Sequence, residues 1–294
     1  MSLPVVFIHS GPIAYLYETV YQLKAFNPNT AIHLIGTKES IGYQKQLKHH
    51  YINQYNDKAE AFSGLYKHYS NNSVGFELFC IQRWFVLYQF MKENNIERCL
   101  HLDTDVLLFC NIDELLELYG NSSWTICGIS GHSTIIRIDV LKELCDYIWK
   151  VYNQPDASGY METLLKEYRV TVPEYNISDM TWLQLFAEEY PDKVINTWKV
   201  MHDKVCDASL AIGGDVFEME SGLKKIILQD YRPFFIMKEN YRLIKALSLH
   251  FQGGSTKSLI TKYVVNRTIL FYVIRLYFKV QWYKYRIFNK LSRA

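Results

Sequence analysis

Two carboxylates one residue apart follow a short apolar run near the middle of the chain. Asp103 and Asp105 flank Thr104 directly after the segment 99–102, and the apolar segment 106–109 comes next. Such a run predicts a buried β-strand, and open α/β sheets bind ligands at the carboxyl ends of their strands. Neighbouring carboxylates repel each other unless a cation lies between them, and Mg²⁺ and Mn²⁺ prefer oxygen ligands. The pattern therefore predicts a divalent metal site, with Thr104 beside it, that binds the diphosphate of a nucleotide.

One charged residue interrupts an apolar segment that precedes this strand. The segment 76–91 is apolar around nearly its whole circumference, which predicts a helix buried on all sides, and Arg83 stands in its middle. A buried guanidinium without a partner is costly. We therefore expect Arg83 to form a salt bridge with a carboxylate or to contact a bound phosphate. Both expectations hold together if the partner is a metal-binding Asp.

Predicted strands and helices alternate at the start of the chain. The β-branched run 5–9, a helix over 14–26 and a second strand over 31–36 predict a β-α-β opening. The predicted fold class is therefore α/β, a Rossmann-like mixed sheet flanked by helices. The sequence contains no G-x-G-x-x-G fingerprint, but His9 and Ser10 end the first strand and could approach a nucleotide there.

The chain resembles the GT-A glycosyltransferases, in particular the glycogenin-like and bacterial lipopolysaccharide galactosyltransferase group (family 8-like). The D-x-D strand carries the resemblance together with three later segments in the order of that group. These are 131–138 (GHSTIIRI), 178–182 (SDMTW) and 249–257 (LHFQGGSTK). Met180 stands where the group usually has Gln, and one extra residue precedes Lys257. The resemblance covers residues 3–257 and implies the GT-A fold.

The resemblance implies a role for each matching residue. His250 would complete the ligand set of the two metal-binding carboxylates, and Lys257 would hold phosphate. Asp179 would reach the transferred or acceptor sugar and His132 would lie beside the donor sugar, so these two are the predicted catalytic residues. The group retains anomeric configuration, which the resemblance extends to this chain. If transfer instead inverts the configuration, Asp179 is the first candidate for the general base.

The predicted function is metal-dependent glycosyl transfer. The donor would be a nucleotide-sugar, a UDP-sugar by resemblance, with Mn²⁺ or Mg²⁺ as cofactor and a saccharide or glycolipid as acceptor. One alternative treats Asp103 and Asp105 as the nucleophile loop of a haloacid-dehalogenase-like phosphatase. Another is a non-catalytic domain that binds a sugar nucleotide or a glycan. The sequence leaves the sugar, the acceptor and the oligomeric state open.

Charge is distributed unevenly along the chain. Beyond Glu239 there are eleven Lys or Arg residues and no Asp or Glu, although the net charge of the whole chain is only +2. A basic tail on an acidic body predicts an anionic surface as partner. A nucleic-acid partner is not expected, because the acidic body offers no basic groove. We expect two parts: the transferase domain over 1–257 and a helical tail over 258–294.

The tail predicts an amphipathic helix that begins at about residue 268. Its charges interrupt every apolar run that could span a membrane, so a helix lying in an anionic membrane interface is expected instead. Docking of this helix on the domain or on a second subunit is the alternative. The predicted basic face comprises Arg275, Lys279, Arg286, Lys290 and Arg293, and the apolar face comprises Val273, Tyr277, Val280, Ile287 and Leu291.

The cysteines and the amino terminus bear on the compartment. The six cysteines have irregular spacing without a C-x-x-C pair, which predicts reduced thiols. The first residues lack the basic region and long apolar run of a signal peptide. We therefore expect a cytoplasmic protein that is peripheral at the inner face of a membrane.

Overall fold

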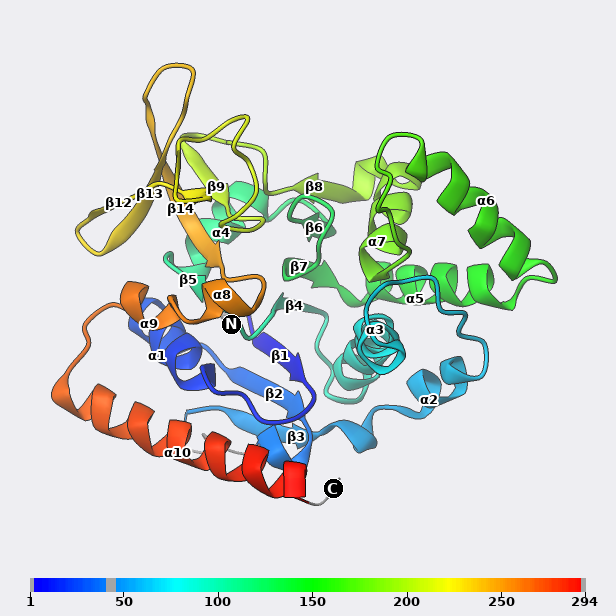
Figure 1. Cartoon of the computed structure of the whole chain (residues 1–294), viewed down its shortest axis with the longest axis horizontal. Helices are drawn as coiled ribbons and strands as arrows, with labels where there is room; N and C mark the ends of the chain where they lie inside the picture. Colours follow the sequence, from blue (N-terminus) through cyan, green and yellow to red (C-terminus); the bar gives the residue numbers. More distant parts are fainter. Residues whose placement is uncertain (1–2, 41–45, 292–294) are drawn as a thin grey trace.

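A seven-stranded mixed sheet lies at the centre of the computed structural model, which describes residues 3–40 and 46–291 (Figure 1). The strand order is β3-β2-β1-β4-β7-β6-β8. Strands β1 to β4 run parallel, whereas β7 is antiparallel to both β4 and β6. The strands are β1 (Val5–His9), β2 (Ile32–Gly36), β3 (Lys48–Tyr51), β4 (Arg98–Leu102), β6 (Trp124–Ile126), β7 (Ser133–Arg137) and β8 (Val194–Asn196). The predicted fold class, a mixed sheet flanked by helices, is confirmed.

A second sheet is built largely from the later part of the chain. Its order is β12-β13-β14-β5, and β9 pairs with β14. Its strands are β5 (Val106–Leu108), β9 (Lys204–Cys206), β12 (Ile226–Gln229), β13 (Arg232–Ile236) and β14 (Leu243–His250), and a separate hairpin joins β10 (Met219–Glu220) to β11 (Leu223–Lys224). Because β5 follows β4 immediately, the turn between them links the two sheets.

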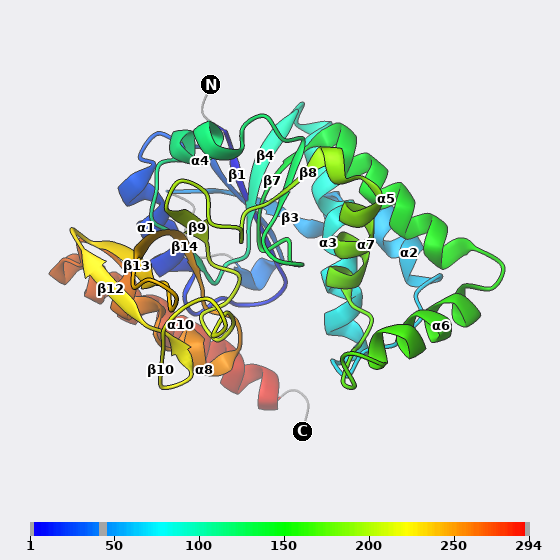
Figure 2. The ribbon, with the colours of Figure 1, turned by 90° about the horizontal axis from the view of Figure 1, so that it is seen from above.

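Helices cover both sides of the seven-stranded sheet. Figure 2 shows α2, α3, α5, α6 and α7 gathered on one side, with α1 and the second sheet on the other. The helices are α1 (Leu16–Phe26), α2 (Asp57–Ser63), α3 (Val74–Glu93), α4 (Ile112–Tyr119), α5 (Ile138–Asn153), α6 (Ala157–Arg169), α7 (Asp179–Glu189), α8 (Gly254–Lys257), α9 (Ile260–Tyr263) and α10 (Ile269–Leu291). Short 3-10 turns occupy Lys38–Ser40, Ile52–Gln54 and Pro191–Lys193.

Strand β1 shows why a continuous apolar run forms a central strand. Val6 and Ile8 pack into the core beneath α3, and Val5 and Phe7 pack into the opposite core beneath α1. Side chains alternate between the two faces of a strand, so a strand that is buried on both faces is apolar at nearly every position. The predicted opening is confirmed, with the helix beginning at Leu16 rather than at residue 14.

The expectation that the helix over 76–91 is buried on all sides is wrong at its amino-terminal end. The helix forms as α3, and its central part is buried around Trp84 and Phe85. Phe76, in the first turn, is 58% exposed. These first turns border the pocket described below, so their apolar side chains face a cavity instead of the protein core.

The tail helix α10 docks on the domain and also keeps an apolar face in solvent. Phe271 is fully buried, and Ile274 and Phe278 pack against the same core as α9. Figure 1 shows α10 running beside α1, and Arg275 pairs with Glu18 of α1 at 2.7 Å. The prediction of two faces was therefore incomplete. A third face of α10 packs on the domain, and Arg275, which was assigned to the basic face, contacts the domain as well.

The predicted apolar face of the tail is exposed over its described side chains. Val273, Tyr277, Val280 and Ile287 are between 42% and 59% exposed. The side chains of Arg286, Lys290 and Leu291 and the whole of Arg293 lie outside the described residues. Within residues 3–40 and 46–291, no helix has both the length and the apolar character needed to cross a membrane.

Candidate active site

The turn between β4 and β5 brings the D-x-D carboxylates beside a residue from late in the chain. Strand β5 pairs antiparallel with β14, and His250 lies opposite Val106. The N–H of Phe251 donates to the carbonyl of Asp105 at 3.0 Å. This pairing brings His250 to the end of the turn that carries Asp105, and its Nε2 lies 3.7 Å from an Asp105 carboxylate oxygen.

Asp103, Asp105 and His250 form a cluster that suits a divalent cation. One ligand atom from each lies within 4.8 Å of the others. The Nδ1 of His250 lies 2.7 Å from the carbonyl oxygen of Ala208. A carbonyl can only accept, so Nδ1 donates this hydrogen bond and Nε2 is the nitrogen that faces Asp105, 3.7 Å away. Two carboxylates and an imidazole nitrogen are ligands that Mn²⁺ and Mg²⁺ accept, so these residues fit the predicted metal.

Arg83 bridges two carboxylates that the sequence separates widely. Its guanidinium donates to Asp103 at 2.7 Å and to Asp179 at 2.7 Å. Burial opposes ionisation of Asp103, but the charge of Arg83, followed by the neighbouring His101, holds the pKa of this carboxyl well below its ordinary value. The salt bridge predicted for Arg83 is confirmed, and its partner is one of the predicted metal ligands.

The position of Asp179 follows from the start of α7. The hydroxyl of Thr181 accepts from the N–H of Ser178 at 3.1 Å, which fixes the first turn of the helix. Asp179 is therefore the first helical residue, and it lies buried at the pocket wall against Arg83. Met180, which replaces the Gln of the resembled group, lines the same pocket.

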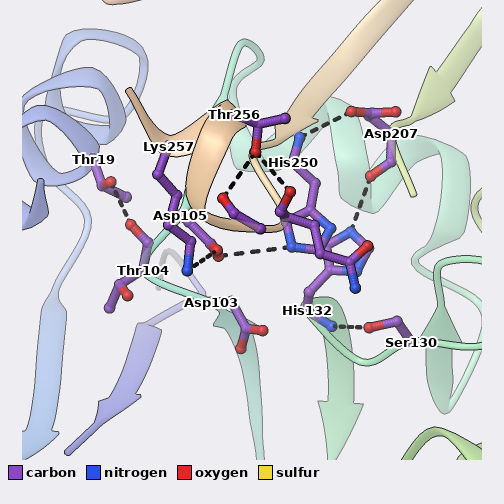
Figure 3. A network of polar contacts seen from close by, with 12 residues as sticks. Thr19, Asp103, Thr104, Asp105, Ser130, His132, Asp207, His250, Thr256 and Lys257 are labelled. Carbon is purple, nitrogen blue, oxygen red and sulfur yellow. Dashed lines mark hydrogen bonds and ion pairs between the residues drawn. The ribbon is translucent and has the colours of Figure 1, made fainter. Parts of the chain in front are cut away.

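Lys257 approaches the cluster from the turn that follows β14. Gly253 has a φ of +89°, a left-handed conformation that favours glycine, and α8 begins at the next residue. The ammonium of Lys257 lies 3.0 Å from Asp105 (Figure 3). Burial lowers the pKa of Lys257, but Asp105 and Tyr15 outweigh this effect and raise it. Lys257 therefore presents a positive charge beside the cluster.

His9 and Ser10 line the pocket beside Thr104, as predicted from the end of the first strand. The Nδ1 of His9 lies 3.3 Å from the hydroxyl of Thr104, and Thr19 of α1 donates to the Thr104 carbonyl at 2.6 Å. Burial, and then the charge of Lys257, lower the pKa of His9 to about 4. The imidazole is therefore neutral at pH 7, which suits contact with a base or a ribose.

His132 does not face the sugars, contrary to the prediction. It is fully buried and absent from the pocket wall, and its ring stacks on that of His250 with centroids 3.9 Å apart. Its Nε2 donates to the carbonyl of Asp207 at 3.0 Å. Burial, followed by His250, lowers the pKa of His132 well below its ordinary value. Backbone and side-chain hydrogen bonds hold His132 there, because its carbonyl accepts from the N–H of Asp103 at 2.7 Å and its ring donates to Asp207. The preceding Gly131 lies against the ring of Trp84, where a Cβ would not fit.

The cluster lies in a pocket of about 670 Å³ that gathers segments from the whole chain. The predicted residues that line it are His9, Ser10, Arg83, Asp103, Thr104, Asp105, Asp179, His250 and Lys257. The sequence reasoning missed Tyr15, Asn72, Phe76, Ser130 and Gln252, which also line it. Gln252 lies within the late motif and Ser130 adjoins the segment 131–138, so these two had a local signal. Tyr15, Asn72 and Phe76 had none.

Comparisons with known proteins give structural neighbours and no sequence match. No protein-family model and no curated protein sequence matches the chain. Solved structures that resemble it include glycosyltransferases. Mouse xyloside xylosyltransferase 1 in its apo form is 12% identical, with 70% of this chain and 88% of that chain covered and a TM-score of 0.46. The galactosyltransferase LgtC in complex with donor and acceptor sugar analogues is 13% identical, with 92% and 100% covered and a TM-score of 0.44.

A third neighbour is the apo form of the glycosyltransferase GlyE from Streptococcus pneumoniae TIGR4. It is 14% identical, with 98% of this chain and 64% of that chain covered and a TM-score of 0.41. Because all these identities and TM-scores are low, the functional conclusion depends on the side chains of this chain's own site.

Proposed function

We propose that the chain is a metal-dependent glycosyltransferase that moves a sugar from a nucleotide-sugar to a saccharide or lipid-linked acceptor. The observation that carries this proposal is the cluster of Asp103, Asp105 and His250, with Lys257 beside it, in one pocket. Three oxygen and nitrogen ligands next to a fixed ammonium suit a metal-bound diphosphate. The order of motifs along the chain, which resembles the GT-A enzymes, supports a nucleotide-sugar, and a UDP-sugar is the donor we propose.

Each residue of the site has a task in this reaction. Asp103, Asp105 and His250 would hold Mn²⁺ or Mg²⁺, which neutralises the charge of the leaving diphosphate when bound. Lys257 would pair with phosphate oxygens, and neutral His9 with Ser10 would contact the nucleoside. Arg83 holds the carboxylates of Asp103 and Asp179 in fixed orientations through two hydrogen bonds of 2.7 Å each.

Asp179 is the residue we assign to the sugars. Its carboxylate lies at the pocket wall and its side chain is 7% exposed. With retention of configuration it would contact the transferred or acceptor sugar. With inversion it would take the proton of the acceptor hydroxyl as a general base.

The proposal includes a membrane surface as partner of the tail. Residues 1–257 would be the catalytic part and 258–294 the tail, in a cytoplasmic protein that is peripheral at the inner face of a membrane. The outward face of α10 carries large apolar side chains, and this supports an interfacial helix. These side chains are Ile269, Leu270, Tyr272, Val273, Leu276, Tyr277, Val280, Tyr283 and Ile287.

A donor screen tests the function. UDP-, GDP- and dTDP-sugars are incubated with Mn²⁺ and either the wild type or Asp105→Ala, and nucleotide release is measured. Release from one donor that the substitution abolishes would support the proposal and name the sugar. Phosphate release from simple phosphoesters, with no nucleotide release from any donor, would refute it in favour of a phosphatase. Binding of a donor without any release would indicate a non-catalytic module.

A further inference from the structure

Two fully buried charged side chains lie behind His250. The ammonium of Lys224, in β11, is 2.6 Å from a carboxylate oxygen of Asp207, which follows β9, and both side chains are 0% exposed. Lys224 also donates to the carbonyl of Ser209 and lies over the ring of Trp198, 4.5 Å from its centroid. Transfer of two charges out of water is costly, and apolar residues of similar size often replace such pairs without loss of stability. The presence of this pair therefore calls for a reason other than stability.

The second carboxylate oxygen of Asp207 reaches the predicted metal ligand. It accepts from the N–H of His250 at 3.0 Å, and the Asp207 carbonyl accepts from Nε2 of His132 at 3.0 Å. The next residue, Ala208, accepts from Nδ1 of His250. Figure 3 shows Asp207 joined by dashed lines to both histidines. The dipeptide 207–208 therefore holds the backbone of His250, its ring nitrogen and the ring stacked on it.

We propose that the buried pair Asp207 and Lys224 positions His250 for metal binding, an inference that rests on the proposed function. Lys224 fixes one oxygen of the Asp207 carboxylate, so that the other oxygen faces the N–H of His250. With the backbone of His250 held there, the Ala208 carbonyl directs Nε2 toward Asp105. Residues that orient a metal ligand through hydrogen bonds typically change metal affinity by about 10- to 100-fold when they are replaced.

The Lys224 side chain is closely packed, and its backbone is hydrogen-bonded. Gly213 has a φ of +100°, and a Cβ there would lie 2.8 Å from the Trp198 ring and 3.2 Å from Cε of Lys224. The N–H of Lys224 donates to the carbonyl of Leu210 at 2.8 Å, and the N–H of Leu210 donates to the His250 carbonyl at 3.3 Å. Through Leu210, the backbone of Lys224 is thus linked to His250. His250 is also the residue that the Lys224 side chain positions through Asp207.

Mn²⁺ binding without donor, measured by the electron paramagnetic resonance signal of free Mn²⁺, tests the inference. The variants are Lys224→Met and Asp207→Asn. In an Asn side chain an NH2 group, which can only donate, replaces one of the two carboxylate oxygens, so either Lys224 or the His250 N–H then faces a donor. We expect each variant to bind Mn²⁺ at least about tenfold more weakly than the wild type. In a His250→Ala background we expect neither substitution to weaken binding further, because the effect passes through His250.

Lys245→Met is the matched control. Lys245 lies near the other end of β14 and pairs with Glu114 at 2.6 Å, with a side chain only 11% exposed. Its replacement should lower the melting temperature and leave Mn²⁺ affinity unchanged. Asp207→Asn keeps the side-chain volume, so it decides the matter even if Lys224→Met does not fold. If folded Asp207→Asn bound Mn²⁺ with the affinity of the wild type, this inference would be overturned and the proposed function would stand. A wild type that binds no Mn²⁺ would overturn the proposed function as well.

Discussion

The ring of His132 lies almost flat against the ring of His250, with an interplanar angle of 19° and centroids 3.9 Å apart. This contact makes His132 a support of the predicted metal ligand and removes it from the pocket wall. A buried neutral imidazole at this position can keep the ring of His250 in place, but it cannot reach a sugar.

His132→Phe distinguishes support of the His250 ring from a catalytic role for His132. The substitution keeps an aromatic ring against His250 and removes both nitrogens. We expect kcat to fall by no more than about tenfold, whereas loss of a general acid or base costs roughly 10² to 10⁴. His132→Ala should lower the free energy of unfolding by about 2–4 kcal/mol through the cavity that it leaves. Steady-state kinetics and urea unfolding measure the two effects. A loss of more than about 100-fold in folded His132→Phe would restore a catalytic role for this residue.

Lys257→Met tests the phosphate contact. The substitution keeps the length of the side chain and removes the charge beside Asp105. We expect UDP, titrated calorimetrically with Mn²⁺ present, to bind about 10- to 100-fold more weakly, since hydrogen bonds to charged groups contribute about 1.5–3 kcal/mol. Lys262→Met is the control, because Lys262 lies nearby on α9 with an exposed side chain. Equal UDP affinity of Lys257→Met and the wild type would show that Lys257 does not hold phosphate.

Stability should depend on pH through His33. Burial, then the neighbouring His50 and Lys48, lower the pKa of His33 from 6.5 to about 4. Between these two values the unfolded chain binds a proton that the folded protein does not. Its contribution to stability is therefore fully present above pH 6.5 and lost as the pH falls toward 4. A shift of this size corresponds to about 3 kcal/mol.

His33→Phe should reduce this loss, and urea unfolding at pH 7 and pH 4.5 measures it. The free energy of unfolding of the variant should fall less between the two pH values than that of the wild type. His68→Phe is the control, because His68 is exposed. An equal fall in His33→Phe and in the wild type would contradict the assignment of this pH dependence to His33.

The tail should bind anionic vesicles through the outward face of α10. We expect the wild type to float with vesicles that contain phosphatidylglycerol and to be released by salt, because charge attraction adds to burial of the apolar face. Leu276→Asp with Val280→Asp should abolish flotation. Val170→Asp is the control, since Val170 is 84% exposed at the end of α6. Flotation of the double variant at the level of the wild type would remove α10 as the membrane contact.

The fold was predictable where local pattern decides it. The run over 5–9 and the segment over 99–102 became central strands, because largely apolar runs of that length are buried on both faces. The three faces of α10 were not predictable. A helical pattern gives the angular position of Phe271 and Val280 but not which apolar side meets the domain.

The site was predictable to the extent that a motif marked it. The resemblance implied that His250 joins Asp105 in one ligand set, but the pairing of β5 with β14 that brings them together could not be predicted from local propensity. Asp207 and Lys224 had no signal of their own, because a buried ion pair looks like two surface charges in a sequence. Tyr15 reaches the pocket only because α1 packs on the turn at Thr104, a contact between segments far apart in the chain.

Metal removal tests the central claim most directly. The wild type is treated with EDTA, desalted and assayed for nucleotide release from its donor while Mn²⁺ is added back, with Asp105→Asn in parallel and Asp113→Asn, on α4, as control. We predict that release stops after chelation, returns with Mn²⁺ in the wild type and in Asp113→Asn, and does not return in Asp105→Asn. Full nucleotide release by the chelated wild type would contradict a metal-dependent transferase built on Asp103, Asp105 and His250.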